Sequence, residues 1–164
     1  LFLCTGNSAR SILAESILNH DGEGRFRAFS AGSHPNGQVH PAAIGLLKKL
    51  GHPSASLRSK SWDEFSGPKA PRIDFVFTVC DSAAAEVCPV WPGQPVSAHW
   101  SLPDPAAVDG TQHQIHLAFA KTYQMLEHRI ALLVDLPLES LESVSLQKQL
   151  DAIGNAGPSP KNIS

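Results

Sequence analysis

A short polar loop between an apolar strand pattern and a helix pattern constrains this chain more than any other feature. The letters CTGNSARS, residues 4–11, follow the apolar run LFL and precede a segment with helical periodicity. Backbone N–H groups that converge at a helix N-terminus, together with the helix dipole, bind a tetrahedral oxyanion well. The residues expected to surround such an anion are Thr5, Gly6, Asn7, Ser8, Ala9 and Arg10.

The loop also carries a cysteine and an arginine with five residues between them. A guanidinium offers a fork of donors suited to two oxygens of one anion, so Arg10 is the expected oxyanion binder. The same positive field favours the thiolate form of Cys4, the candidate nucleophile, and Ser11 can donate its hydroxyl to that sulfur. A lone pattern of this kind also fits a buried cysteine and a surface arginine. The strand, the glycine and the helix around it favour the anion-binding thiolate.

Alternating strand and helix signals predict an α/β fold. Runs of apolar or β-branched residues indicate strands at 1–3, 26–31, 73–79 and 95–100. Helical periodicity indicates helices at 7–20, 40–50, 115–133 and 138–153. Strands separated by helices favour a parallel sheet with right-handed crossovers, which binds ligands at the C-terminal edge of its strands. Cys4 and Cys80 each follow a predicted strand and are therefore expected at that edge.

Length and composition are those of one globular domain. The 164 residues are 42% hydrophobic and 17% charged, which excludes the disordered and fibrous classes. We expect a single domain over residues 1–154 and a loose tail over 155–164, where glycine and proline gather. A net charge of −2 argues against a nucleic-acid or membrane-surface partner. No apolar run approaches the ~20 residues that a membrane-spanning helix needs.

The three cysteines are too few for a secreted scaffold held by disulfides. The expected setting is the reducing cytoplasm, with thiols that are free or redox-cycling. The N-terminus shows no export signal, and because the chain opens at Leu1 without Met, we expect a few residues to precede it. We expect a monomer.

Four motifs together resemble the low-molecular-weight protein tyrosine phosphatases and the arsenate reductases that share their fold. They are CTGNSARSILAE at 4–15, SAGS at 30–33, RSKS at 58–61 and LPDP at 102–105, so the resemblance covers most of the chain. It implies a three-layer α/β fold with a central four-stranded parallel sheet and helices on both sides. It also implies that Cys4 is the nucleophile, Arg10 the oxyanion binder and Asp104 the general acid. Pro-Asp-Pro alone would indicate a turn, but expelling oxide from a tetrahedral centre requires a proton donor.

Two further cysteines favour the reductase over the phosphatase. Reducing arsenate to arsenite takes two electrons, which Cys80 can supply by attacking the Cys4 sulfur, and Cys88 can then resolve that disulfide. The family's thioredoxin-coupled members also have a cysteine pair here, sometimes with one residue less between the two. We expect residues 81–87 to form a helical turn that unwinds to let Cys88 approach. Two buried structural cysteines are the alternative.

The residues after Asp104 are a second discriminator. Phosphatases of this family usually have aromatic residues there to sandwich a phenyl ring, whereas this chain continues Ala-Ala-Val at 106–108. A small inorganic oxyanion, arsenate or phosphate, therefore fits better than an aryl phosphate. Trp91 and Trp100 are expected in the core or at its rim. A low-molecular-weight tyrosine or aryl phosphatase that uses Cys4, Arg10 and Asp104 remains the alternative. A non-catalytic anion sensor would need neither a thiolate nor an acid.

The resemblance also implies partners. The external reductant would be thioredoxin or glutaredoxin, and no tightly bound cofactor is expected. Some reductases of this family bind a monovalent cation near the loop, and potassium is the candidate ion here. Its candidate ligands are Asn7, Glu15, Ser30 and Asp63. The eight histidines, including His113 and His116, indicate no metal site, because no carboxylate or cysteine stands at a supporting spacing.

Overall fold

The computed structural model describes residues 1–157 and forms a three-layer α/β fold. Four short strands pair in the order β2-β1-β3-β4, and every neighbouring pair is parallel. The predicted four-stranded parallel sheet between helices is therefore confirmed. The strands are β1 Phe2–Cys4, β2 Ser30–Gly32, β3 Phe75–Thr78 and β4 Val96–His99.

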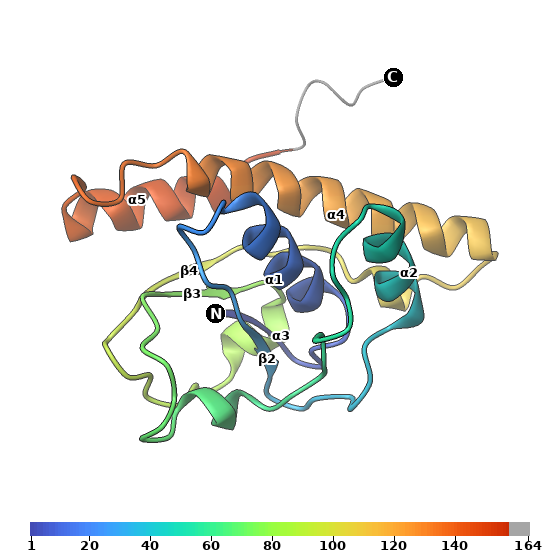
Figure 1. Cartoon of the computed structure of the whole chain (residues 1–164), viewed down its shortest axis with the longest axis horizontal. Coiled ribbons are helices and arrows are strands. Elements are labelled where there is room, and N and C mark those ends of the chain that lie inside the picture. The colour runs from blue at the N-terminus through green and yellow to red at the C-terminus, as the bar shows by residue number, and fades with distance from the viewer. Residues whose placement is uncertain (158–164) are drawn as a thin grey trace.

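The helices lie on both sides of this sheet. In Figure 1, α4 and α5 lie above the strands, and α3 and the green turn of η1 lie below them. Helix α1 packs against α4. The helices are α1 Arg10–Asp21, α2 Pro41–Lys49, α3 Asp81–Ala85, α4 Gln112–Val134 and α5 Ser143–Gly154. Two short 3₁₀ helices are η1 Trp62–Phe65 and η2 Pro105–Ala107.

The sheet separates two hydrophobic clusters, because side chains alternate between its faces along each strand. Phe2 and Cys4 belong to the larger cluster, which contains residues of α1, α4 and α5. Leu3, from the same strand, belongs to a smaller cluster with Phe65 and Trp91. The central strand therefore carries a core on each face, which fixes the position of the loop that follows it.

Three elements begin three to five residues later than the sequence pattern indicates. The last helix, expected from residue 138, begins at Ser143. For the other two, β2 and α1, the reason is local. The second strand was expected from residue 26 and begins at Ser30. The Asn19 side chain occupies both backbone groups of Ala28, accepting from its N–H at 2.8 Å and donating to its carbonyl at 3.1 Å, so this part of the chain is bound to α1. The first helix was expected from Asn7 and begins at Arg10, because Asn7 has a left-handed φ of 45° that no helix tolerates.

The structure describes all residues of the expected domain, 1–154, and the first three residues of the expected tail. The last helix ends at Gly154, and of the expected tail, residues 158–164 lie outside the described part of the chain. Between residues 1 and 157, no helix combines the length and the apolar character needed to cross a membrane.

Candidate active site

Cys4 ends β1 and Arg10 begins α1, so residues 5–9 form the connecting loop. Cys4 is buried, with 4% of its surface exposed, and its Sγ lies 2.9 Å from the Oγ of Ser11 in the first turn of α1. This hydroxyl is placed to donate a hydrogen bond to a Cys4 thiolate. A buried thiolate without such a donor would be costly, so the pair of residues suits a nucleophile.

Asn7 braces the loop from inside. Its side chain is fully buried, donates to Ser11 Oγ at 2.8 Å and accepts from the backbone N–H of Lys60 at 2.9 Å. Asparagine tolerates the left-handed φ of 45° better than most residues do. Asn7 therefore orients the hydroxyl that contacts Cys4 and joins the loop to the segment before η1.

The carbonyl groups of the loop point toward neighbouring segments. They accept hydrogen bonds from the backbone N–H groups of His34, Asn36 and His40 and from the hydroxyl of Ser59 at 2.9–3.1 Å. None of the N–H groups of residues 6–9 donates a hydrogen bond to another described residue. Loop carbonyls that are bound elsewhere and N–H groups without a protein partner leave donors available for an oxyanion.

Gly32 allows the loop to approach the end of β2. A Cβ at this position would contact the Thr5 carbonyl oxygen and would lie 3.0 Å from the Asn7 nitrogen. Both are backbone atoms, which cannot move aside as a flexible side chain can. The glycine of the SAGS motif is therefore required by close packing against the anion loop.

Arg10 joins the loop to the expected acid. Its Nη1 donates to the Leu102 carbonyl at 3.0 Å, and its Nη2 lies 3.6 Å from Asp104 Oδ2. The other carboxylate oxygen of Asp104 accepts from the Ala106 N–H at 3.0 Å at the start of η2. Asp104 is 40% exposed, so it can exchange a proton with water while lying beside the anion loop.

Cys80 lies against the same loop. It is 3% exposed, and its Sγ is 3.6 Å from the Thr5 Oγ1 next to Cys4. The sulfur also accepts from the Ala83 N–H at 3.4 Å as the N-cap of α3. The parallel sheet thus places Cys80 against the loop that begins at Cys4, 76 positions earlier in the chain, since both residues lie where strands end at the same edge.

Cys88 is placed differently. It is half-buried against the smaller cluster, and its Sγ lies 3.8 Å from the Glu86 carbonyl oxygen. Burial, with a smaller contribution from the Glu86 carboxylate, raises the pKa of the Cys88 thiol. Cys4 and Cys80 belong to the larger cluster, and all three cysteines are free thiols. Cys88 therefore packs with a different cluster from Cys80.

Three of the four expected cation ligands surround a lysine. The Lys60 ammonium is 4.0 Å from Glu15 Oε1 and 3.4 Å from Ser30 Oγ, and its backbone N–H binds Asn7. Burial lowers the pKa of Lys60 and raises that of Glu15, and each charge opposes the shift of the other. The fourth candidate, Asp63, is exposed. These residues do not fit a potassium ion, because Lys60 already supplies the positive charge.

The tryptophans do not wall the anion loop. Trp91 is 9% exposed in the smaller cluster, and Trp100 is fully buried in the larger cluster, where its Nε1 donates to the Leu150 carbonyl at 3.0 Å. The expectation of core tryptophans is confirmed. Neither ring is available to sandwich a phenyl group over the loop.

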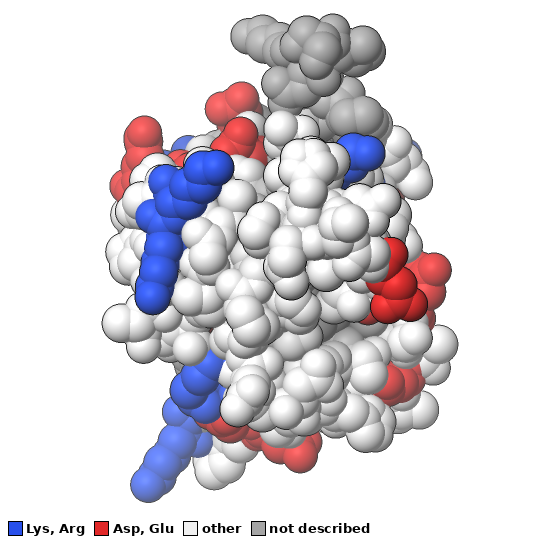
Figure 2. All heavy atoms as spheres, turned by 90° about the vertical axis from the view of Figure 1, so that its right-hand side faces the viewer, with Lys and Arg blue, Asp and Glu red and all other residues white. Residues whose placement is uncertain are grey.

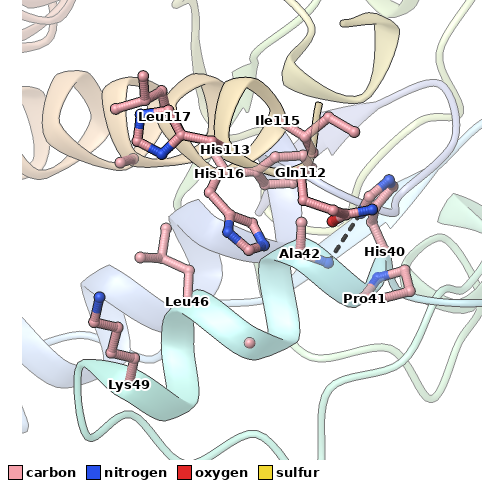
Figure 3. A pocket seen from close by; sticks show the side chains of 13 residues that line it. His40, Pro41, Ala42, Leu46, Lys49, Gln112, His113, Ile115, His116 and Leu117 are labelled. Carbon is pink, nitrogen blue, oxygen red and sulfur yellow. Dashed lines mark hydrogen bonds between the residues drawn. The ribbon is translucent and has the colours of Figure 1, made fainter. Parts of the chain in front are cut away.

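A hollow of about 840 Å³ lies between α2 and α4 (Figure 3). Its lining contains His40, His113 and His116 but none of the three cysteines. Figure 3 shows the histidines spread around the hollow, and the described residues contain no group of three His, Cys, Asp or Glu suited to a metal ion. Figure 2 shows this face of the molecule, on which charged side chains lie mainly toward the edges.

Sequence reasoning missed two sets of contacts at the site. The first is the contact of Lys60 with Glu15 and Ser30, which the RSKS motif does not indicate. The second is a polar network around Asp81 and His99 beside Cys80. No local signal separates Lys60 from a surface lysine, since its acidic partner is 45 positions away.

Comparison with known proteins agrees with this geometry. The family of low molecular weight phosphotyrosine protein phosphatases matches residues 1–150. An arsenate reductase of Halalkalibacterium halodurans is 34% identical over 129 residues, which cover 79% of this chain and 89% of that protein.

Two solved structures of arsenate reductases are similar to this chain in fold. The arsenate reductase of Archaeoglobus fulgidus superposes with a TM-score of 0.60 at 25% identity, over 79% of this chain and 97% of that chain. A thioredoxin-dependent arsenate reductase of Corynebacterium glutamicum gives a TM-score of 0.53 at 25% identity, over 80% of this chain and 61% of that chain.

Proposed function

Because the chain belongs to the low molecular weight phosphotyrosine protein phosphatase family, we propose that it is a cytoplasmic arsenate reductase that uses a relay of three thiols. The observation that carries this proposal is the Cys80 sulfur, 3.6 Å from Thr5 Oγ1 beside the nucleophile. A phosphatase regenerates its nucleophile with water and has no use for a second thiol there. The arsenate reductases among its relatives support the same conclusion.

The first step forms a bond between sulfur and arsenic. Arsenate binds to the N–H groups of the loop and to Arg10, and the Cys4 thiolate attacks arsenic. An As–O bond breaks, and Asp104 donates a proton so that the oxygen leaves as water. Arg10 contacts Asp104 at 3.6 Å, so the acid lies on the side of the loop where the anion binds.

The second step transfers two electrons to arsenic. The Cys80 thiolate attacks the Cys4 sulfur, a disulfide forms, and the electron pair of the S–As bond leaves with arsenic as arsenite. Cys88 then attacks the Cys80 sulfur, which forms the Cys80–Cys88 disulfide and releases Cys4 as a thiolate. An external dithiol reduces this disulfide, and thioredoxin is our proposed donor, with glutaredoxin as the alternative.

Mass spectrometry after one turnover tests the relay. Reduced protein mixed with equimolar arsenate should contain an intramolecular Cys80–Cys88 disulfide, and the Cys88→Ser variant should stop at a Cys4–Cys80 disulfide. Cys4→Ser should form neither disulfide. Cys88→Ser that turns over at the wild-type rate with thioredoxin as its only reductant would overturn the three-thiol relay. Coupled assays with thioredoxin and with glutaredoxin identify the donor.

The same experiment separates the reductase from a phosphatase. A phosphatase would leave all three thiols free after exposure to arsenate and would hydrolyse an aryl phosphate rapidly. We expect only slow aryl phosphate hydrolysis, because Trp91 and Trp100 are buried in the two clusters and offer no wall for the ring. The loop alone can run the phosphate chemistry, so Cys80→Ser should retain this slow activity.

A further inference from the structure

The segment between the two relay thiols, residues 81–88, has little hydrophobic anchoring. Ala83 is its one fully buried side chain, while Val87 is 95% exposed. Helix α3 has only five residues, and its hydrogen bonds from Ala84 to Cys80 and from Glu86 to Ala83 are long, at 3.3 Å. A helix of this length is not stable by itself, so contacts with the rest of the protein must hold it.

Side chains at the start of α3 bind the ends of two strands. Asp81 Oδ1 accepts hydrogen bonds from His99 Nε2 at 2.8 Å and from Ser101 Oγ at 2.9 Å. The other ring nitrogen of His99 lies 2.7 Å from Thr78 Oγ1, at the end of β3. Hydrogen bonds from His99 and Ser101 lower the pKa of Asp81, so the acceptor is a charged carboxylate.

A second contact holds the other end of the helix. Glu86, directly after α3, accepts a hydrogen bond from Ser33 Oγ at 2.9 Å, and its carboxylate lies 3.8 Å from His34 Nδ1. Ser33 follows β2 and so belongs to the opposite side of the anion loop from β4. The two ends of the segment are therefore bound to two separate edges of the site.

We propose that Asp81 and Glu86 are positioning residues that clamp segment 81–88 against the protein and set the rate at which Cys88 reaches the Cys4–Cys80 disulfide. This inference rests on the relay proposed above and names the contacts that limit its last thiol exchange. The clamped segment keeps Cys88 packed against the smaller cluster, away from Cys80 in the larger one. Opening both contacts frees Cys88 to attack Cys80. The first exchange, between Cys80 and Cys4, needs no such opening.

Alkylation of the reduced protein tests the clamp without arsenate. Iodoacetamide labelling of Cys88, followed by peptide mass spectrometry, should be on the order of 3- to 10-fold faster in Asp81→Ala and in Glu86→Ala than in wild type, as expected for the loss of one or two exposed hydrogen bonds. Glu86 is the C-cap and lies outside α3, so faster labelling in Glu86→Ala would not reflect a change of helix propensity. Asp81→Asn keeps an acceptor oxygen and should restore most of the protection.

Two further variants separate the clamp from side effects. Ser33→Ala removes the same hydrogen bond as Glu86→Ala while keeping the carboxylate near Cys88, so faster labelling in both shows that the contact matters rather than the charge. If Glu86→Ala does not fold, Ser33→Ala tests the same contact in its place. Glu139→Gln removes an exposed carboxylate that makes no hydrogen bond or ion pair to another described residue, and it should label at the wild-type rate.

A single turnover with arsenate shows which step the clamp controls. In Ser33→Ala, arsenite should be released at the wild-type rate, while the Cys80–Cys88 disulfide should form several-fold faster. Labelling of Cys88 at the wild-type rate in Asp81→Ala and Ser33→Ala would overturn the clamp. Faster labelling in a protein that forms no disulfide with arsenate would uphold the clamp and defeat the relay, so the two failures are distinguishable.

Discussion

The anion loop and the segment after β3 both follow central strands, yet they are held in opposite ways. Residues 4–10 are bound by a buried asparagine, by four hydrogen bonds to their carbonyls and by a glycine that permits close backbone contact. Residues 81–90 have one fully buried side chain and two valines that are 95% and 89% exposed. One region is rigid, and the other is weakly attached.

The difference matches the chemistry proposed for each region. An oxyanion is bound tightly only if the donors are already in place, because ordering them during binding would cost free energy. A relay thiol must instead travel between two partners, which requires a segment with a low local stability. Low hydrophobic burial in residues 81–90 supplies that property without loosening the loop.

Removing the buried ammonium should have the largest effect on the rigid region. We expect Lys60→Met to lower the free energy of unfolding by about 2–4 kcal/mol, because it leaves Glu15 buried without a cation. Equilibrium unfolding in urea measures this loss. Lys60→Met/Glu15→Gln should recover most of it, and failure to recover would show that the charge pair is not the cause.

The pH dependence of this variant has a defined sign. Burial raises the pKa of Glu15 in the folded state, and Lys60 opposes that rise, so the Lys60→Met variant has the higher folded pKa. The Lys60→Met variant is therefore most stable below the pKa that Glu15 has in the unfolded chain. This stability is lost as the pH rises through the higher pKa of Glu15 in the folded protein. The double variant should lack this loss.

Because Lys60 supplies the positive charge beside Glu15, the wild-type protein should have the same Tm in potassium chloride and in sodium chloride.

A side chain added at Gly32, where the anion loop packs against the end of β2, should have the next largest effect. Gly32→Ala places a methyl group against the Thr5 carbonyl, which we expect to cost about 1–3 kcal/mol and to displace the anion loop. Because the anion loop is displaced, Gly32→Ala should lose most of its reductase activity even under conditions in which the variant remains folded. Gly67→Ala is the matched control, because its Cβ would meet no atom within 4 Å. Equal losses in the two variants would contradict the packing argument.

The packed Cys88 should show a raised pKa. The rate of Cys88 alkylation should rise with pH around a midpoint above that of a cysteine in the unfolded chain, because burial and Glu86 both disfavour the thiolate. Labelling across a pH series, with peptide mass spectrometry, measures the midpoint. The same series in urea should give the ordinary midpoint. A folded midpoint at or below that value would mean that Cys88 is not packed as described.

Exposed valines of the weakly attached segment should matter least. Val87→Thr should change the free energy of unfolding by less than about 0.5 kcal/mol, since its side chain has almost no contacts to lose. Val76→Thr, at a position that is 3% exposed in β3, buries a hydroxyl and should cost about 1–3 kcal/mol. Thermal unfolding of both variants compares them. A large effect at Val87 would show that the segment is anchored after all.

Much of the fold could be predicted because its signals are local. Alternating helix and strand patterns predicted the parallel sheet, and the letters between β1 and α1 predicted the anion loop. The expected starts of β2, α1 and α5 were wrong by three to five residues. For β2 and α1 an asparagine interrupts regular structure, Asn19 through its hydrogen bonds to the backbone of Ala28 and Asn7 through its left-handed φ.

The amino-acid order by itself determined which groups can do the chemistry: a thiol and a guanidinium on one short loop, and two more thiols farther along. Tertiary structure alone decided which of those groups meet. Cys80 reaches Thr5, Lys60 reaches Glu15 and Arg10 reaches the Leu102 carbonyl across 75, 45 and 92 positions. Contacts of this length depend on how strands pair and helices pack, and no local pattern of residues encodes them.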